Sequence, residues 1–180
     1  MKNKVLETDT HIYFLTGPFS QWSMNAFKGY IWFPGSAMLP EMDFVCAEQY
    51  MMASKAFLFG DVDVFKKIMK AKKPDQHKDL GRLVQNFNPD IWNENARKIV
   101  MKGNYYRSLH SKEYMNALQN SGTKILVEGS RQDKIWGVGL SWDDPAIQDE
   151  KNWLGTNWLG QAHMIVRDVV YGGDRTQIFE

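Results

Sequence analysis

The chain has 180 residues, 43% of them hydrophobic and 24% charged, which is ordinary globular usage and excludes a largely disordered protein. Twenty-two Lys and Arg against 21 Asp and Glu leave a formal charge of +1, so a polyanionic partner would have to meet a local patch. The single Cys46 excludes an intrachain disulfide framework and indicates a reducing compartment. One domain covering residues 1–180 is expected from this length.

Two strands are predicted in the first part of the chain. Residues 12–16 and 27–33 are rich in β-branched and aromatic side chains and are bounded by Gly, Pro and Ser, and residues 34–40 are expected to form a loop. The first residues lack the apolar run of a secretory signal, and Gly, Pro and Ser interrupt the uncharged stretch 11–27. We therefore expect a soluble, cytoplasmic protein without a membrane partner.

Helical patterns begin at Ala47. Good helix formers occupy residues 47–57, and the pattern ends at Gly60. Asp61 is expected to cap a second helix that runs to about residue 70. A short third helix is expected to begin at Pro74.

The clearest helix start in the sequence is Asn88 followed by Pro89. A further helix is expected over residues 111–120, and a short buried strand over 124–128. Residues 129–156 show little periodicity and are expected to form long loops with at most one short strand. Asn157 is then predicted to cap a last helix through about residue 170. The sequence therefore predicts a mainly helical α+β domain with a small β-sheet.

Several common sites are excluded by their spacing. Gly137 and Gly139 have no third glycine and do not form a dinucleotide fingerprint. The segment 155–160 has the glycine spacing of a phosphate-binding P-loop, but Gln161 and Ala162 stand where Lys and Ser or Thr are required. The four histidines show no metal-ligand spacing, so no metal site is expected.

A carboxylate and an amine share one face of the helix predicted over residues 47–57. Glu48, Met52 and Lys55 stand at i, i+4 and i+7. A partly desolvated carboxylate in such a place is typical of a general acid. The alternative is an ordinary glutamate at the solvent edge of an amphipathic helix.

A second cluster follows the strand predicted over residues 124–128. Glu128 ends this strand, and Asp133 stands three residues before Trp136. Loops at strand ends often carry catalytic side chains, but an ordinary acidic turn has the same pattern. Trp92 and Trp136 have the chemistry to stack on a planar heterocycle, and each is alternatively a core residue.

A basic tract covers residues 66–82. It consists of Lys66, Lys67, Lys70, Lys72, Lys73, Lys78 and Arg82 and is broken only by Asp75 and Asp79. Such a tract can bind a phosphate or a nucleic-acid strand, or it can be a solvated helix face. Because Arg82 follows Gly81, an inward orientation of its side chain is a further possibility.

The ordered set of motifs resembles a known family. The motifs are Phe19-Ser20-Gln21-Trp22, Ala47-Glu48-Gln49-Tyr50 with Lys55-Ala56 and Phe59-Gly60-Asp61, Leu80-Gly81-Arg82, Trp92, Leu126-Val127-Glu128 with Asp133 and Trp136-Gly137, and Gly155-Thr156-Asn157-Trp158-Leu159-Gly160 with Met164 and Arg167. Together they look like the NADAR family over residues 13–170. The chain departs from the family pattern at Gln21 and Val138, which are expected to line the pocket, and at His163.

The resemblance implies a NADAR-like, mainly helical α+β domain that hydrolyses N-glycosidic bonds. The implied substrate is a small phosphoribosyl-amine or pyrimidine nucleotide among the riboflavin-biosynthesis intermediates. Some family members instead remove ADP-ribose from guanine, so an ADP-ribosyl substrate or a modified nucleic acid is the alternative. A module that binds a nucleotide or ADP-ribose without cleaving it is a third possibility. The hydrolysis requires neither a metal nor an organic cofactor.

Residue roles follow from the resemblance together with this chemistry. Glu48 is expected to act as acid, base or stabilising carboxylate, with Asp133 or Glu128 as its partner. The remaining expected roles are substrate-binding ones. They fall to Ser20 and Gln21 in the first motif, to Trp92 and Trp136 against the base, to Lys55, Arg82 and Arg131 at phosphate oxygens, and to Asn157 at a ribose hydroxyl or phosphate.

Overall fold

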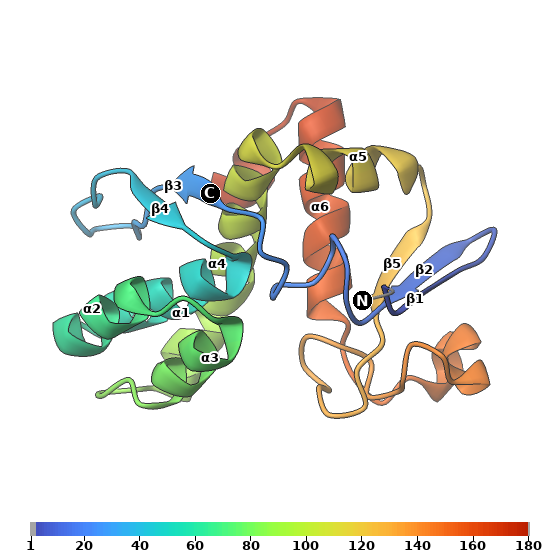
Figure 1. Cartoon of the computed structure of the whole chain (residues 1–180), viewed down its shortest axis with the longest axis horizontal. Coiled ribbons are helices and arrows are strands. Elements are labelled where there is room, and N and C mark those ends of the chain that lie inside the picture. The colour runs from blue at the N-terminus through green and yellow to red at the C-terminus, as the bar shows by residue number, and fades with distance from the viewer. Residues whose placement is uncertain (1–2, 180) are drawn as a thin grey trace. The chain divides into compact units, whose positions relative to one another are not determined.

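The computed structural model describes residues 3–179, drawn in Figure 1. They form two compact units, each with its own helices and a small sheet. Unit 1 comprises the described residues of Met1–Ser23 and Lys112–Glu180, and unit 2 is Met24–Ser111. Helices hold most of the regular structure in both units, so the predicted α+β class is confirmed.

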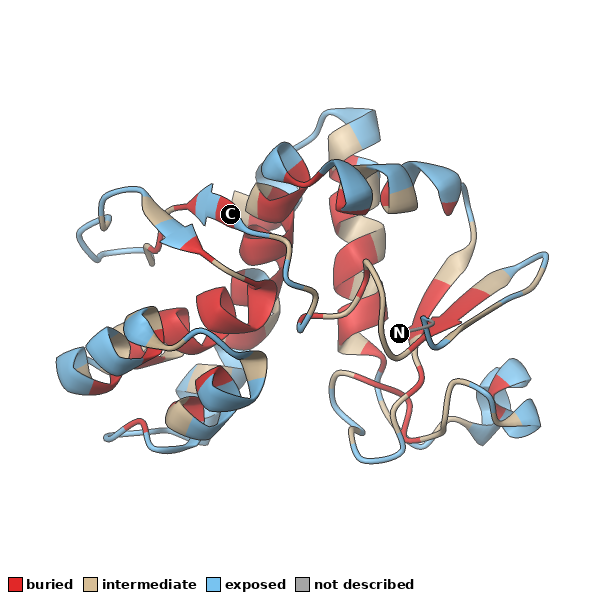
Figure 2. Ribbon diagram, viewed as in Figure 1, coloured by how far each residue is buried: buried red, intermediate tan, exposed pale blue. Residues whose placement is uncertain are grey.

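Unit 2 is built around helix α1 (Ala47–Leu58). This helix packs against α2 (Val62–Lys70), α3 (Pro74–Arg82) and α4 (Pro89–His110). Strands β3 (Phe27–Gly29) and β4 (Met42–Phe44) pair antiparallel, and β3 contacts α4. Figure 2 shows buried residues along both α1 and α4, which form the core of this unit.

The predicted caps of α2 and α4 are confirmed. The Asp61 carboxylate accepts a hydrogen bond from the Val64 amide at 2.9 Å, and the Asn88 side chain accepts from Asp90 and Ile91 at 2.9 and 3.2 Å. Each satisfies amides that a helix start leaves without intrahelical partners.

The ionisation of Asp61 is expected to make the stability of the fold depend on pH. Amides of Gln85 and Val64 bind its carboxylate and hold its pKa below the ordinary value. A lowered folded-state pKa stabilises the fold above the unfolded-state pKa, and this stabilisation is lost as pH falls through the folded-state pKa. Urea unfolding of Asp61→Asn should show a deficit near pH 6 that shrinks towards about pH 3. Asp63→Asn, in the same first turn, is the control, and an equal deficit there would contradict the assignment.

Unit 1 contains a three-stranded sheet in the order β1-β2-β5. Its strands are β1 (Val5–Glu7), β2 (His11–Phe14) and β5 (Ile125–Glu128), with β1 antiparallel and β5 parallel to β2. The helices are α5 (Lys112–Asn120), α6 (Trp158–Gly172) and α7 (Thr176–Phe179). The segment between β5 and α6 contains two short 3₁₀ helices, η1 (Pro145–Gln148) and η2 (Glu150–Asn152), and no strand, as expected.

The two faces of this sheet pack against different partners, because successive side chains of a strand point to opposite faces. Tyr13 and Val127 join a buried cluster with Val138 and Ile147. Phe14 instead packs against His163 of α6, with ring centroids 5.7 Å apart. Val138 is therefore a fully buried core residue, so its own side chain belongs to the core of unit 1, and only neighbouring residues of its segment are open to a ligand.

The strand predictions need three corrections. The strand expected over 27–33 ends at Gly29, because beyond it the Tyr30 carbonyl accepts from the Tyr50 hydroxyl and the Ile31 carbonyl accepts from the Leu39 amide. Strands β1 and β4 were not predicted, since three residues are too few to show a two-residue period. Helix α7 was also missed. Within residues 3–179, no helix is both long enough and apolar enough to cross a membrane.

Candidate active site

In unit 1, parallel pairing brings two predicted site segments to one edge of the sheet. Phe14 lies opposite Glu128, the last residues of β2 and β5. The segment with Ser20 and Gln21 and the loop with Asp133 therefore leave the sheet from the same edge. Loops at the carboxyl ends of parallel strands are a common place for ligand sites.

The loop after β5 is held rigidly by its own backbone and by Asp133. The Asp133 carboxylate accepts from the amides of Ile135 and Trp136 at 2.9 and 2.7 Å. The Val138 amide donates to the Glu128 carbonyl at 3.0 Å. Asp133 thus shapes the turn that places Trp136. This geometry is that of an acidic turn, which the sequence offered as the alternative to a catalytic role.

Asn157 joins the start of α6 to β5. Its side chain accepts from the Glu128 amide at 3.1 Å and donates to the Leu126 carbonyl at 2.9 Å. It makes no cap hydrogen bond, and its φ of 52° lies in the left-handed region. Asn157 is the N-cap residue of α6, as predicted, but its side chain does not cap the helix, because β5 uses both ends of this amide. Loop carbonyls bind the first amides of α6 instead, including that of Trp158.

Two further predicted site residues of this loop, Arg131 and Trp136, differ in exposure. Trp136 is half-buried and meets the edge of Trp158, with ring centroids 5.8 Å apart. The Arg131 side chain is 72% exposed, and it forms a long ion pair with Asp144, at 3.9 Å. Arg131 therefore has a largely exposed guanidinium, and its role as a phosphate contact stays a prediction.

Gln21 is a buried amide with an unmet hydrogen-bonding group. The residue is 9% exposed, and its Nε2 has no hydrogen-bond partner among residues 3–179. Beside it, the Ser20 hydroxyl accepts from the Trp22 amide at 3.2 Å. A buried donor without a partner costs about 1–3 kcal/mol. A ligand whose acceptor bonded this donor would therefore gain binding free energy.

A buried histidine anchors the segment that carries Ser20 and Gln21. His163 donates from Nε2 to the Phe19 carbonyl and accepts at Nδ1 from the Tyr114 hydroxyl, both at 2.7 Å. Its ring also packs on Phe19, with centroids 5.4 Å apart. Neither His163 nor Tyr114 was predicted to have a role, and the available signal was a histidine among the apolar residues of α6.

Removing the Tyr114 hydroxyl is expected to weaken unit 1. Tyr114→Phe leaves the His163 acceptor buried without its donor, which should lower the free energy of unfolding by about 1–3 kcal/mol in urea titrations. Tyr171→Phe is the matched control, because the exposed Tyr171 hydroxyl makes one long bond of 3.3 Å to Met115. Equal losses in the two variants would contradict the anchoring role.

In unit 2, Glu48 is buried in the first turn of α1. It is 7% exposed, so placement at the solvent edge of an amphipathic helix is wrong. A carboxylate in the first turn is favoured by the helix dipole. Gln49 fixes this turn, since its Oε1 accepts from Val45 at 2.8 Å and its Nε2 donates to the Ile68 carbonyl of α2 at 3.0 Å. This role of Gln49 was not predicted from the sequence.

Cys46 and His77 form a neutral pair beside this turn. His77 Nε2 donates to the Ala71 carbonyl at 3.1 Å, which leaves Nδ1 to accept from the Cys46 thiol at 3.5 Å. Burial lowers the pKa of His77 and raises that of Cys46 to about 11. A protonated, fully buried thiol is not a nucleophile, so the pair links α1 to α3 structurally.

Lys55 and Trp92 meet at an aromatic cluster. The Lys55 ammonium donates to the Gly81 carbonyl at 2.9 Å and lies 4.2 Å from the ring centroid of Phe87 and 5.4 Å from that of Trp92. Burial lowers the pKa of Lys55. Trp92 is half-buried, and Phe87, which sequence analysis missed, is 44% exposed. The lysine thus fixes an aromatic surface suited to a planar base.

Arg82 does not point inward. Its side chain is 66% exposed and pairs with Asp79 at 3.0 Å. All seven basic residues of the tract 66–82 are exposed, as expected for a solvated face.

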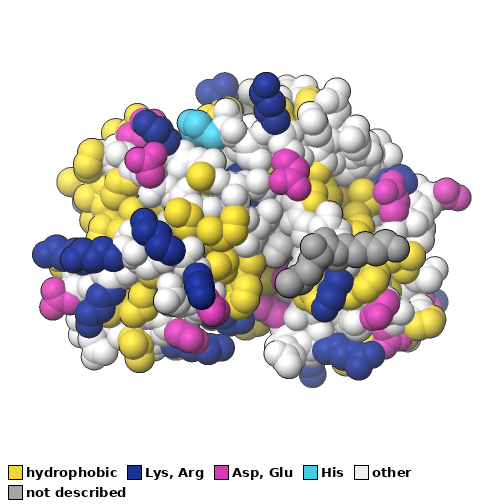
Figure 3. Space-filling view, viewed as in Figure 1, with side chains coloured by type: hydrophobic (Ala, Val, Ile, Leu, Met, Phe, Trp, Pro, Cys, Tyr) yellow, Lys and Arg dark blue, Asp and Glu magenta, His cyan; other side chains and the backbone are white. Residues whose placement is uncertain are grey.

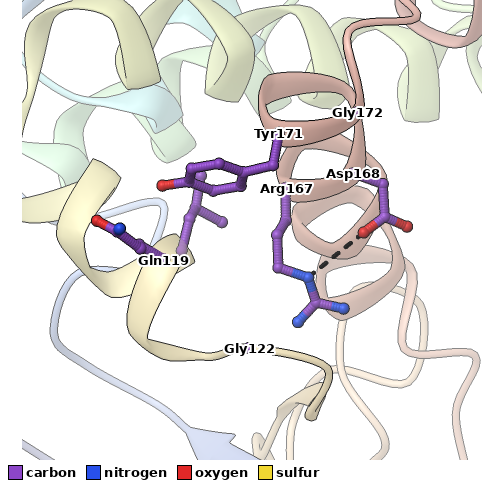
Figure 4. A pocket seen from close by; sticks show the side chains of 7 residues that line it. Gln119, Gly122, Arg167, Asp168, Tyr171 and Gly172 are labelled. Atoms are coloured by element: carbon purple, nitrogen blue, oxygen red, sulfur yellow. Dashed lines mark hydrogen bonds and ion pairs between the residues drawn. The ribbon is translucent and has the colours of Figure 1, made fainter.

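A pocket between α5 and α6 has a structural arginine in its wall (Figure 4). It encloses about 510 Å³ and is lined in part by Gln119, Arg167 and Tyr171. The Arg167 guanidinium donates to the Lys124 carbonyl at 2.8 Å and to the Ser121 hydroxyl at 3.1 Å, and it reaches Asp168 at 3.5 Å. Because these protein groups occupy the arginine and no predicted site residue lines the pocket, we do not assign it a catalytic role.

The fold and these side chains define a mainly helical α+β protein with carboxylates at a helix start and a strand end, a residue type that hydrolases of glycosidic bonds use. The chain belongs to the NADAR domain family, whose model matches residues 13–170. It is 40% identical over 171 residues to "N-glycosidase R617" of Acanthamoeba polyphaga mimivirus, covering 91% of this chain and 98% of the viral protein. The expected enzyme class, an N-glycosidase, is thereby confirmed.

Two further relatives support the family and the fold. "Protein irg-1" of Caenorhabditis elegans is 33% identical over 132 residues, which cover 72% of this chain and 62% of the nematode protein. The NMR structure of the Escherichia coli protein YbiA superposes with a TM-score of 0.67 at 20% identity, covering 94% of this chain and 90% of YbiA. At that identity the second likeness establishes the fold alone.

Proposed function

We propose that this N-glycosidase acts on a small phosphoribosyl substrate in which ribose C1 is bonded to the nitrogen of an amine or pyrimidine, the chemistry of early riboflavin intermediates. Water adds to C1, the C–N bond breaks, and the base leaves with a proton, giving ribose 5-phosphate. The single observation that carries the proposal is the burial of Glu48 in a chain 40% identical to a protein named N-glycosidase. The proposed functional domain is the whole chain, 1–180.

The proposed roles divide between proton transfer and substrate binding. Glu48 transfers a proton to the leaving base, and the second carboxylate is Glu128 or Asp133. The activities of Glu128→Gln and Asp133→Asn would distinguish between these two. Trp92 and Trp136 are half-buried surfaces for the base. The remaining proposed substrate contacts are Ser20, Gln21, Lys55, Arg82, Arg131 and Asn157.

The test is product release from two substrates side by side. One is a pyrimidine ribosylamine phosphate, and the other is an oligonucleotide carrying ADP-ribose on guanine, the second candidate, which the exposed basic tract 66–82 favours. Cleavage of the small substrate alone supports the proposal. Cleavage of the oligonucleotide alone overturns it in favour of the second candidate. Binding without cleavage of either overturns both and indicates a nucleotide-binding module.

A further inference from the structure

Basic side chains lie mainly on the surface of this protein, and Figure 3 shows Lys and Arg spread over one face. Two basic residues among 3–179 are buried instead, Lys102 and Arg107 of α4. The Lys102 ammonium lies 3.6 Å from the ring centroid of Trp32, in a cation–π contact. Arg107 is among the largest fully buried side chains and lies in the last turn of α4. Because a buried guanidinium keeps its charge, it is stable inside a protein only where another charge balances it.

The packing of α4 against α1 shows which part of α1 lies near Arg107. Close to the end of α1, the Lys55 ammonium is 5.4 Å from the ring centroid of Trp92, close to the start of α4. One and a half turns earlier on α1, Tyr50 packs on Gly103, where an added Cβ would lie 2.6 Å from a ring carbon. The two helices therefore run antiparallel. Arg107 follows Gly103 by four residues, so it lies on the same face of α4, one turn closer to the start of α1.

This arrangement brings together two helix ends of opposite polarity. Glu48 is the acidic residue in the first turn of α1, and Arg107 is a basic residue in the last turn of α4. The dipole of each helix favours the charge that it carries there. The Cys46 thiol lies within electrostatic reach of both side chains. Burial is the largest cause that raises its pKa, Glu48 raises it further, and Arg107 lowers it.

The other titratable groups of unit 2 that meet this turn are neutral or exposed. Cys46 and His77 of α3 form the neutral pair described above. Burial raises the pKa of Tyr50 and keeps its hydroxyl protonated. Asp43 of β4 is exposed, and α2 meets the turn through backbone carbonyls. Within the described part of unit 2, one carboxyl group and one guanidinium are thus the buried acid and base at these two helix ends.

We propose that Arg107 is a positioning residue for the hydrolysis, whose guanidinium balances the buried charge of Glu48 and holds that carboxyl group in place. The inference rests on the proposed function and deepens it. Burial favours the protonated form of a carboxyl group, and a nearby cation favours the ionised form. Between these opposing effects Glu48 can both take up a proton and release it to the leaving base, as a general acid must in each turnover.

The first test is a double-mutant cycle of urea unfolding, which needs no turnover. Arg107→Met and Glu48→Gln each leave one buried charge without its balance, whereas the double variant removes both charges. The two effects should therefore be coupled by at least about 10-fold in the unfolding equilibrium constant. Additivity within about twofold would overturn the proposal. If Arg107→Met does not fold by itself, the double variant should fold, and failure of both would also overturn the proposal.

The matched control is a cycle between Glu48→Gln and Lys98→Met, which removes an exposed positive charge from the same helix. The effects of these two substitutions should add within about twofold in the unfolding equilibrium constant. Equal coupling in both cycles would overturn the proposal, because the loss of any positive charge on α4 would then have the same consequence.

The second test is the pH dependence of kcat, which a merely structural arginine would not move. Removing the cation favours the protonated form of Glu48, so the proton is lost at a higher pH. In Arg107→Met the pH above which kcat falls should rise by about 1 unit or more. At pH 7 kcat should fall about 10-fold with little change in KM, because the acid is weaker. Arg107→Lys keeps the charge and should restore the profile to within about 0.5 pH unit.

The two tests separate the possible failures. Coupling in the unfolding cycle together with an unmoved pH profile would overturn the positioning role of Arg107. If the wild-type protein cleaves neither candidate substrate, the proposed function fails, and the unfolding cycle still decides whether Arg107 balances Glu48.

Discussion

Replacing Glu48 with Gln is expected to lower kcat by about 10²- to 10⁴-fold, the contribution of a positioned acid–base group. Gln keeps the size of the buried side chain and its place in the first turn of α1, but it cannot transfer a proton. Substrate affinity should change little, because the lost interaction belongs to the departure of the base. Initial rates of base release, with a separate binding titration, measure the two effects.

A control substitution separates this effect from a general loss of carboxylates. Glu94→Gln alters an exposed glutamate on α4 and should leave kcat within about twofold of wild type. Thermal unfolding of both variants shows whether the fold is retained. A folded Glu48→Gln enzyme that keeps most of its kcat would remove Glu48 from the chemistry and leave Glu128 and Asp133 as the carboxylates to examine.

Replacing Gly160 with Ala should cost about 3 kcal/mol of unfolding free energy. A Cβ at this position would fall on the Leu126 carbonyl oxygen and lie 2.6 Å from both amide atoms of Asn157. The methyl group would therefore separate α6 from β5 and break the two hydrogen bonds by which Asn157 joins them. Urea unfolding gives the loss directly.

The same helix supplies the matched control. At Gly172, the last residue of α6, an added Cβ meets nothing within 4 Å. Gly172→Ala should leave stability unchanged or raise it by about 0.5 kcal/mol, because alanine loses less backbone entropy in a helix. Similar losses at both positions would mean that α6 tolerates no alanine in general and would contradict the close approach at Gly160.

The elements with strong local signals could be predicted from the sequence. Asp61 and Asn88 bind the amides of the helix starts that follow them, as predicted, since a cap is an interaction within four residues. The strand predicted over residues 124–128 is confirmed as β5. It could be predicted because a short apolar run between turns is also a local pattern. The strand expected over 27–33 was too long because its end is set by the Tyr50 hydroxyl, which comes from another element.

Burial and partner choice were decided by tertiary structure. The sequence indicated Glu48 as a candidate catalytic residue but left open whether it was exposed. In the structure α1 packs against three other helices, and Glu48 is buried. Asn157 is of a residue type that often caps helices, yet its side chain bonds to β5, about thirty residues earlier in the chain. The left-handed backbone at this position directs its amide there. The partners of His163 could not be predicted from its neighbours in sequence, since they are Phe19 and Tyr114. The sequence by itself thus determined the longer helices, the caps of α2 and α4, and the family, whose signals are local or ordered along the chain. The tertiary structure alone decided which polar groups are buried and what they bind, because hydrogen-bond partners distant in sequence meet only after the chain has folded.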